Sequence, residues 1–424
     1  MTTLISNIKQ LLGTREETKL LRGMELAQLP FLDDAFLLIE DGTIADYGTM
    51  YELELKVPQL PKTVIDAQGQ LVLPAWCDSH THLVFANSRE EEFIDKIKGM
   101  SYAEIAANGG GILNSARKLN DINEDELFNS AWQRLEEVGK LGTGAIEIKS
   151  GYGLTVEGEM KMLRVISKLK QRSKLSIKAT FLGAHAYPLQ YREDHQGYLD
   201  SITNEMLPII SKEKLADYID VFCETGFFSP GEMEIICKAG MQYSLKPKLH
   251  VNQLNSIGGI ESAIKLNALT ADHLEVMTDK DISLLGAAET MGTLLPTAAF
   301  FLRMNYPPAR QLIAKNCAIA LASDYNPGSS PGGNMNFVVA LGCIQMKMLP
   351  EEAINAATIN GAYAMGLEKE LGSITIGKKA NLIFTKPVPS LAYLPYSIGS
   401  NLIDKVMLEG EFVLFEPPKN SINH

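Results

Sequence analysis

The chain has 424 residues, which exceeds the usual size of one compact core, so we expect one large domain and a smaller one. Its composition, 46% hydrophobic and 21% charged, is ordinary for a soluble globular protein. The formal net charge of -12 argues against nucleic acid and anionic membranes as partners. The five scattered cysteines without a CxxC spacing argue against a disulfide framework or a cysteine zinc cluster.

The N-terminal sequence "MTTLISNIKQLL" does not read as a signal peptide, because it lacks a basic start and polar residues interrupt its apolar run. No stretch is apolar over the ~18 residues that a membrane helix needs. We therefore expect a cytoplasmic protein that binds no membrane.

Both ends of the chain read as short strands and turns. "AFLLIEDGTIADYG" holds two apolar runs joined at Asp41-Gly42, and "DKVMLEGEFVLF" repeats this hairpin pattern at Glu409-Gly410. We predict that residues 1–70 and 373–424 pair into one small β-sandwich domain, and that residues 71–372 form the other domain.

The middle of the chain alternates short apolar runs with helical patterning, as in "INEDELFNSAWQRLEEVGKLG", where Leu127, Trp132, Leu135 and Val138 share one face. Such alternation predicts a parallel sheet. The apolar runs, eight in number, are "LVLPAWC", "TGAIEIKSG", "SIKATFLGAH", "YIDVFCETG", "PKLHV", "LTADHL", "MGTLLP" and "AIALASD". They predict an α/β fold of the (β/α)8 TIM-barrel kind. The alternative is a doubly wound sheet, but no GxGxxG follows an early strand.

Most histidines lie where a predicted strand ends. The residues in such positions are His80, His82, His185, His250 and His273, and Asp324 follows the eighth strand. The carboxyl ends of barrel strands share one face, which carries the active site, so these side chains are expected to converge. His195 has no such position and is interpreted as a solvated loop residue.

The spacing of His80 and His82 places both rings on one side of a strand, where they can reach one ion. Imidazole nitrogen and carboxylate oxygen suit zinc or iron. Each residue alone also has a plain structural interpretation: His185 and His273 as hydrogen-bonded core histidines, Asp324 as a turn residue. Their joint placement on one rim favours a metal site. Asp78 alternates with His80 and is placed to orient it.

These motifs resemble the amidohydrolase superfamily. "LVLPAWCDSHTHL" is similar to its first-strand motif, apolar-Pro-Gly-x-x-Asp-x-His-x-His, with Ala75 in place of glycine, and residues 356–384 are similar to its closing segment. Within the superfamily, "EIKSGYGL", "FLGAHAYP", "FCETGFFS", "ADHLE" and "SDYNPGSSP" resemble the imidazolonepropionase family. The resemblance covers nearly the whole chain.

The resemblance implies a reaction and a ligand set. Water opens the ring amide of 4-imidazolone-5-propanoate to give N-formimidoyl-L-glutamate in L-histidine degradation, with one divalent metal, Zn²⁺ or Fe²⁺/Fe³⁺. The implied metal ligands are His80, His82, His250 and Asp324. His273 is implied to orient or deprotonate the attacking water, and Asp324 to carry the proton to the leaving nitrogen. Family members are commonly homodimers.

The resemblance also implies the residues that contact the substrate. They are Arg89, Tyr102, Tyr152, His185, Gln253, Asn326, Gly328 and Ser329. Arg89 can fork onto the propanoate carboxylate, although an arginine beside "EEE" is also typical of a surface. Tyr102 lies in a glycine-rich loop, and backbone N–H groups of the turn after Asp324 can cradle an anion.

Two features separate this chain from related patterns. Gln253 stands three residues after His250, where some members have glutamate. An amide can hydrogen-bond a ring and hold its tautomer, but it cannot act as a base. The role of general base is therefore expected of His273 or Asp324. Lys149 ends the second strand, where it is interpreted as structural because the family uses one metal. The alternatives are a mononuclear aminohydrolase that releases ammonia from a nucleobase and a non-catalytic metal-dependent scaffold.

Overall fold

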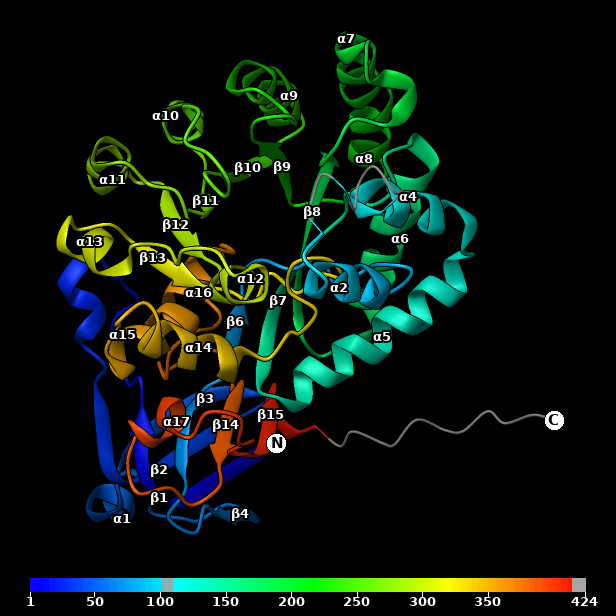
Figure 1. Cartoon of the computed structure of the whole chain (residues 1–424). Helices are drawn as coiled ribbons and strands as arrows, with labels where there is room; N and C mark the ends of the chain where they lie inside the picture. Colours follow the sequence, from blue (N-terminus) through cyan, green and yellow to red (C-terminus); the bar gives the residue numbers. More distant parts are fainter. Residues whose placement is uncertain (101–103, 105–109, 414–424) are drawn as a thin grey trace.

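The computed structural model describes residues 1–100, 104 and 110–413 (Figure 1). Within these residues, the principal strands form two sheets. One is a parallel barrel that occupies the upper part of the view, and the other is a mixed sheet beneath it that both ends of the chain build (Figure 1).

The barrel strands are parallel and follow chain order around the sheet. They are β6 (Trp76–Asp78), β7 (Thr143–Lys149), β8 (Ser176–Ala184), β9 (Tyr218–Cys223), β10 (Lys246–Val251), β11 (Thr270–His273), β12 (Met291–Leu294) and β13 (Ile319–Leu321). Each corresponds to one of the apolar runs, so the predicted (β/α)8 barrel is confirmed.

The first predicted strand is in fact two. β5 (Leu71–Pro74) belongs to the mixed sheet, where it pairs with β1 and β14, whereas β6 belongs to the barrel. The chain crosses between the sheets at Ala75, whose N–H donates to Asn381 O at 2.9 Å, while the N–H of Trp76 donates to Gly142 O at 2.9 Å. One apolar run therefore serves two sheets.

The mixed sheet joins the two ends of the chain. Its other strands are β1 (Thr2–Leu12), β2 (Phe31–Glu40), β3 (Thr43–Thr49), β4 (Thr63–Asp66), β14 (Leu382–Thr385), β15 (Ile403–Leu408) and β16 (Glu411–Phe412). Ile5, Leu37, Val72 and Phe384 belong to its own buried core. The pairing of both chain ends agrees with the sequence, while the exact domain bounds at residues 70 and 373 stay a prediction.

Helices cover the outside of the barrel (Figure 1). The helices between and after the barrel strands are α2 (Glu90–Ile97), α4 (Gly111–Asp121), α5 (Glu124–Lys140), α6 (Val156–Arg172), α7 (His195–Asp200), η4 (Ser201–Met206), α8 (Leu207–Glu213), α9 (Pro230–Gln242), α10 (Gly259–Lys265), α11 (Asp279–Gly286), α12 (Pro296–Leu302), α13 (Ala309–Ala314), α14 (Met335–Ile344), α15 (Pro350–Ala357) and α16 (Ile359–Tyr363). The short remaining helices are η1 (Gly23–Ala27), η2 (Met50–Glu52), α1 (Leu53–Lys56), η3 (Leu189–Tyr191) and α17 (Tyr393–Tyr396). Among the described helices, none has both the length and the apolar character required to cross a membrane.

Helix α5 shows how the sequence sets these elements. The Asn123 side chain caps it by accepting the N–H of Glu126, and its buried face includes Leu127, Leu135 and Val138. Trp132, predicted on the same face, is partly buried against the barrel core.

The barrel closes between its first and last strands. The N–H of Asp324 donates to His80 O at 3.0 Å, and the N–H of His82 donates to Tyr325 O at 2.8 Å. These bonds place the HxH motif beside the end of the eighth strand, on the face where the strands end.

Close packing of α16 on β6 supports this arrangement. A Cβ added at Gly361 would lie 2.4 Å from Cys77 O, so Gly361→Ala should destabilise the fold by about 1–3 kcal/mol through overpacking. Thermal unfolding would show a lower midpoint. Gly231→Ala is the control, because its Cβ would meet only Ser229 Oγ at 4.0 Å; equal midpoints for the two variants would contradict the packing argument.

Candidate active site

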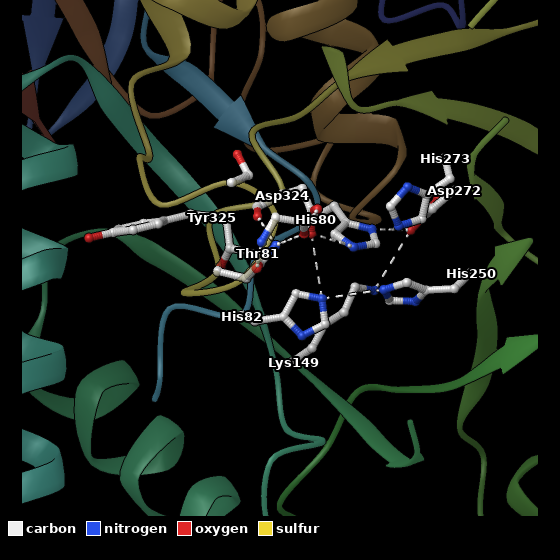
Figure 2. Close-up of polar contacts among 12 residues, drawn as sticks. His80, Thr81, His82, Lys149, His250, Asp272, His273, Asp324 and Tyr325 are labelled. Carbon is white, nitrogen blue, oxygen red and sulfur yellow. Dashed lines mark hydrogen bonds and ion pairs between the residues drawn. The ribbon is translucent and has the colours of Figure 1, made fainter. Parts of the chain in front are cut away.

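Potential metal ligands lie close together where the barrel strands end (Figure 2). His80, His82 and His250 form one group, and His80, His273 and Asp324 form a second. His80 Nε2 and His82 Nε2 lie 3.5 and 3.6 Å from Asp324 Oδ1, and His250 Nε2 lies 3.3 Å from His82 Nε2. Ligands about 2.0–2.1 Å from a tetrahedral ion stand roughly 3.3–3.4 Å apart. The spacing of these atoms therefore fits a metal ion, and the cluster can hold one.

Carboxylates fix the orientation of two of these rings. His80 Nδ1 lies 2.7 Å from Asp272 Oδ2, and His250 Nδ1 lies 2.7 Å from Asp220 Oδ2. Each contact holds the Nδ1–H tautomer and leaves the Nε2 lone pair free for a metal. His80 Nε2 is buried and has no hydrogen-bond partner among the described residues, as expected of a ligand atom.

Asp78 contacts the backbone of His80, whose N–H it accepts, and not the ring. Its carboxylate also accepts the N–H and hydroxyl of Ser323, which ties β6 to the end of β13. The carboxylate that contacts the ring of His80 comes from Asp272 on β11, across the barrel.

Burial makes the cluster suitable for a cation. It lowers the pKa values of His80, His82 and His250 well below the ordinary histidine range, so their rings are neutral, the form in which imidazole binds a metal. Burial also raises the pKa of Asp324 to about 7. A neighbouring cation favours the ionised carboxylate.

His273 lies beside the cluster with a carboxylate behind it. Its Nδ1 is 3.3 Å from Glu275 Oε1. Burial, the largest single influence, lowers the pKa of His273, but the charge and hydrogen bond of Glu275 together with the charges of Asp324 and Asp272 raise it above its ordinary value. The backbone φ angles of His273 and Asp324 are +88° and +52°, which non-glycine residues seldom adopt and which cluster at functional sites.

A cavity of about 300 Å³ opens onto the cluster. Its lining includes His82, His250, His273 and Asp324, together with the predicted substrate residues Arg89, Tyr152, His185, Gln253, Asn326, Gly328 and Ser329. The structure thus brings these residues to one place. Tyr102 lies outside the described residues.

Arg89 points into this cavity. Its side chain is 7% exposed, its Nε donates to Ser115 Oγ at 2.9 Å, and its Nη2 has no hydrogen-bond partner among the described residues. A Cβ on Gly328 would lie 2.2 Å from Arg89 Nη1, so glycine is needed there for the guanidinium to fit. The surface interpretation of Arg89 is wrong.

Lys96 is a second cation in the lining that the sequence analysis missed. It lies two helical turns after Arg89, and its Nζ donates to Gly328 O at 2.9 Å. The spacing of seven residues along a helix was the available signal, because it places both side chains on one face.

Two further lining residues carry polar groups. His185 stacks on His82 with ring centroids 5.2 Å apart, and its Nδ1 lies 2.9 Å from Gly151 O. Burial lowers the pKa of His185 to about 4, so the neutral ring donates from Nδ1 and keeps Nε2 as an acceptor. Gln253 is held by its neighbours, since Glu224 accepts the N–H groups of Leu254 and Asn255.

The turn after Asp324 differs from the expected anion cradle. The N–H groups of Gly328 and Ser329 both donate to Asn326 Oδ1 at 2.8 Å, so neither is free for a ligand. Asn326 Nδ2 also donates to Asp324 O, and the Ser329 hydroxyl donates to Asp324 Oδ2 at 3.3 Å. The turn therefore holds Asp324 in place. His195, outside this site, lies at the start of α7 beside Glu232.

Comparison with known proteins agrees with this geometry. Residues 224–413 match the model of the Amidohydrolase family. The chain is 58% identical over 415 residues to an imidazolonepropionase of Flavobacterium johnsoniae, covering 97% of this chain and 100% of that one. It is 40% identical over 411 residues to an imidazolonepropionase of Parabacteroides distasonis, covering 97% and 98%.

Solved structures share the fold at low identity. E. coli guanine deaminase aligns with a TM-score of 0.74 at 15% identity, covering 98% of this chain and 100% of that one. An adenosine deaminase from Xanthomonas campestris with bound zinc aligns with a TM-score of 0.70 at 15% identity, covering 97% and 92%. The identity and coverage of the sequence relatives are decisive: this chain belongs to the imidazolonepropionase family of the amidohydrolases.

Proposed function

We propose that this chain hydrolyses the ring amide of 4-imidazolone-5-propanoate to N-formimidoyl-L-glutamate in L-histidine degradation. The observation that carries the proposal is one cavity whose lining includes both proposed metal ligands and the guanidinium of Arg89. A metal site fits the hydrolysis of an amide, and the guanidinium of Arg89 fits a substrate with a carboxylate tail.

The proposed ligands of one metal ion, Zn²⁺ or Fe²⁺/Fe³⁺, are His80, His82, His250 and Asp324. Such an ion lowers the pKa of a water molecule toward neutrality and polarises the amide carbonyl. The chain's part is to hold the ligand atoms at the separations described, with the tautomers of His80 and His250 fixed by Asp272 and Asp220.

The proton transfers are assigned to His273 and Asp324. Water oxygen bonds to the ring carbonyl carbon, the ring C–N bond breaks, and the water proton passes to the leaving nitrogen. His273, backed by Glu275, lies beside the cluster to orient the water and take its proton, and Asp324 can deliver a proton to the nitrogen. Gln253, a neutral amide, is assigned a hydrogen bond to the substrate ring.

The remaining lining residues position the substrate. Arg89 binds the propanoate carboxylate, with Lys96 as a second positive charge beside it. The Nε2 of neutral His185 accepts an N–H of the ring. Tyr152 packs between these groups, with its ring 5.4 Å from that of His185 and 5.9 Å from the Arg89 guanidinium carbon. A cytoplasmic location and a homodimer stay predictions.

Turnover of the proposed substrate is the direct test. Addition of the purified protein should abolish the ultraviolet absorbance of 4-imidazolone-5-propanoate, without release of ammonia, and the same sample should contain about one metal ion per chain. Ammonia release from guanine or cytosine would favour the aminohydrolase alternative instead. Metal without turnover of either substrate would favour the scaffold.

His273→Ala should keep the metal and lose most of the turnover. Because a positioned acid–base group contributes roughly 10²–10⁴-fold, kcat should fall by about that factor. The measurement is kcat together with metal content. His195→Ala is the control histidine, since it lies outside the cavity lining, and it should keep native kcat. A near-native kcat for His273→Ala would remove the role assigned to His273.

Arg89→Ala should mainly raise KM. A charge-assisted hydrogen bond contributes about 1.5–3 kcal/mol, so KM should rise roughly 10- to 100-fold if the carboxylate is bound equally in ground and transition states. Steady-state kinetics measure the split between KM and kcat. Lys98→Ala removes an exposed positive charge near the end of the same helix and should change neither value. Equal effects of the two variants would contradict a direct contact.

A further inference from the structure

A layer of charged side chains lies inside the barrel, next to the proposed metal ligands. Its members, from β7, β9, β10 and β11, are Glu147, Lys149, Asp220, Lys248 and Asp272, and each is at most 1% exposed. Charged groups are seldom buried unless they are paired, so their contacts with one another decide whether this layer is stable.

Lys149 differs from the rest because its charged partners reach the metal ligands. Its Nζ lies 2.9 Å from Asp220 Oδ2 and 3.7 Å from Asp272 Oδ2. These are the same two oxygen atoms that contact His250 Nδ1 and His80 Nδ1 at 2.7 Å.

The backbone of Lys149 contacts the segment that carries the other two histidine positions. Its N–H donates at 2.9 Å to the carbonyl oxygen of Thr81, the residue between His80 and His82. One residue of β7 therefore contacts both the backbone beside these histidines and the carboxylates that orient His80 and His250.

From these contacts we infer that Lys149 is a positioning residue for the metal site, and that its ammonium group holds the carboxylates that orient His80 and His250. This role rests on the ligand set proposed above and goes beyond the structural role expected from the sequence.

The ammonium group of Lys149 is the positively charged partner of both orienting carboxylates. Without it, Asp220 and Asp272 would each lose a contact at the oxygen atom that accepts the Nδ1–H of a histidine. The two rings would then be held less firmly in the orientation that points Nε2 at the metal.

Lys248 supplies a matched comparison within the same layer. It is as deeply buried, but its Nζ contacts Glu147 Oε2 at 3.2 Å, Thr270 Oγ1 at 3.1 Å and Ala364 O at 2.8 Å. None of these atoms contacts a ligand histidine. Lys248→Met therefore reports the loss of a buried lysine that has no direct contact with either orienting carboxylate and that acts on Asp272 through its charge and through Thr270.

The test is zinc affinity of the full-length, metal-free protein, measured by competition with a chelator. Lys149→Met should weaken Zn²⁺ binding by about 10- to 100-fold, the usual effect of losing an outer-shell partner, and Lys248→Met should stay within about threefold of the unaltered chain. Equal affinities for the two variants, or tighter binding by Lys149→Met, would overturn the inference.

Two further variants cover the case in which Lys149→Met does not fold. Asp220→Asn and Asp272→Asn keep side-chain volume but lose the charge through which Lys149 acts, and each should weaken Zn²⁺ binding by a similar factor. Native affinity in both would overturn the inference. Failure of the unaltered chain to bind about one Zn²⁺ would instead refute the ligand assignment of the proposed function.

Discussion

The site depends on two backbone hydrogen bonds that close the barrel. Asp324 N–H to His80 O and His82 N–H to Tyr325 O join the first strand to the last at the residues that carry the ligands. Side chains alternate along a strand, so a slip of one residue at this seam would turn the histidines away from Asp324. Barrel closure and site assembly are thus one event.

Side chains in the interior of the barrel determine how the histidine rings of the site are oriented. The rings of His80 and His250 are at most 3% exposed, so buried carboxylates rather than water orient them. Those carboxylates in turn need a buried cation, which Lys149 supplies, while Lys248 pairs with Glu147. Hydrogen bonds also fix the turn that follows Asp324 in the cavity lining. There, Asn326 Oδ1 accepts two backbone N–H groups and so holds the turn in place.

Periodicity carried most of the fold and the convergence of the candidate ligands, while the choice of His250 as the third histidine came from the family resemblance. Alternating apolar runs and helices predicted the barrel, and the position of His80, His82, His250 and Asp324 at strand ends predicted their convergence. Local pattern could not show where Ala75 changes sheet, because both halves of that run are buried. Nor could it show that Asn326 occupies the N–H groups of Gly328 and Ser329, because that depends on side-chain rotation.

The partners of the ligands left a signal in the sequence as well. Glu147 and Lys149 alternate in "AIEIK", and Lys248 precedes His250 by two residues, so each pair shares the inward face of its strand. A charge on the inward face of a barrel strand must find an opposite charge on a neighbouring one. The inward positions of β9 and β11 offer Asp220 and Asp272 as carboxylates for this purpose. Strand alternation does not predict which carboxylate oxygen contacts which histidine ring. Those contacts distinguish Lys149, which pairs with an oxygen that orients His250, from Lys248, which does not.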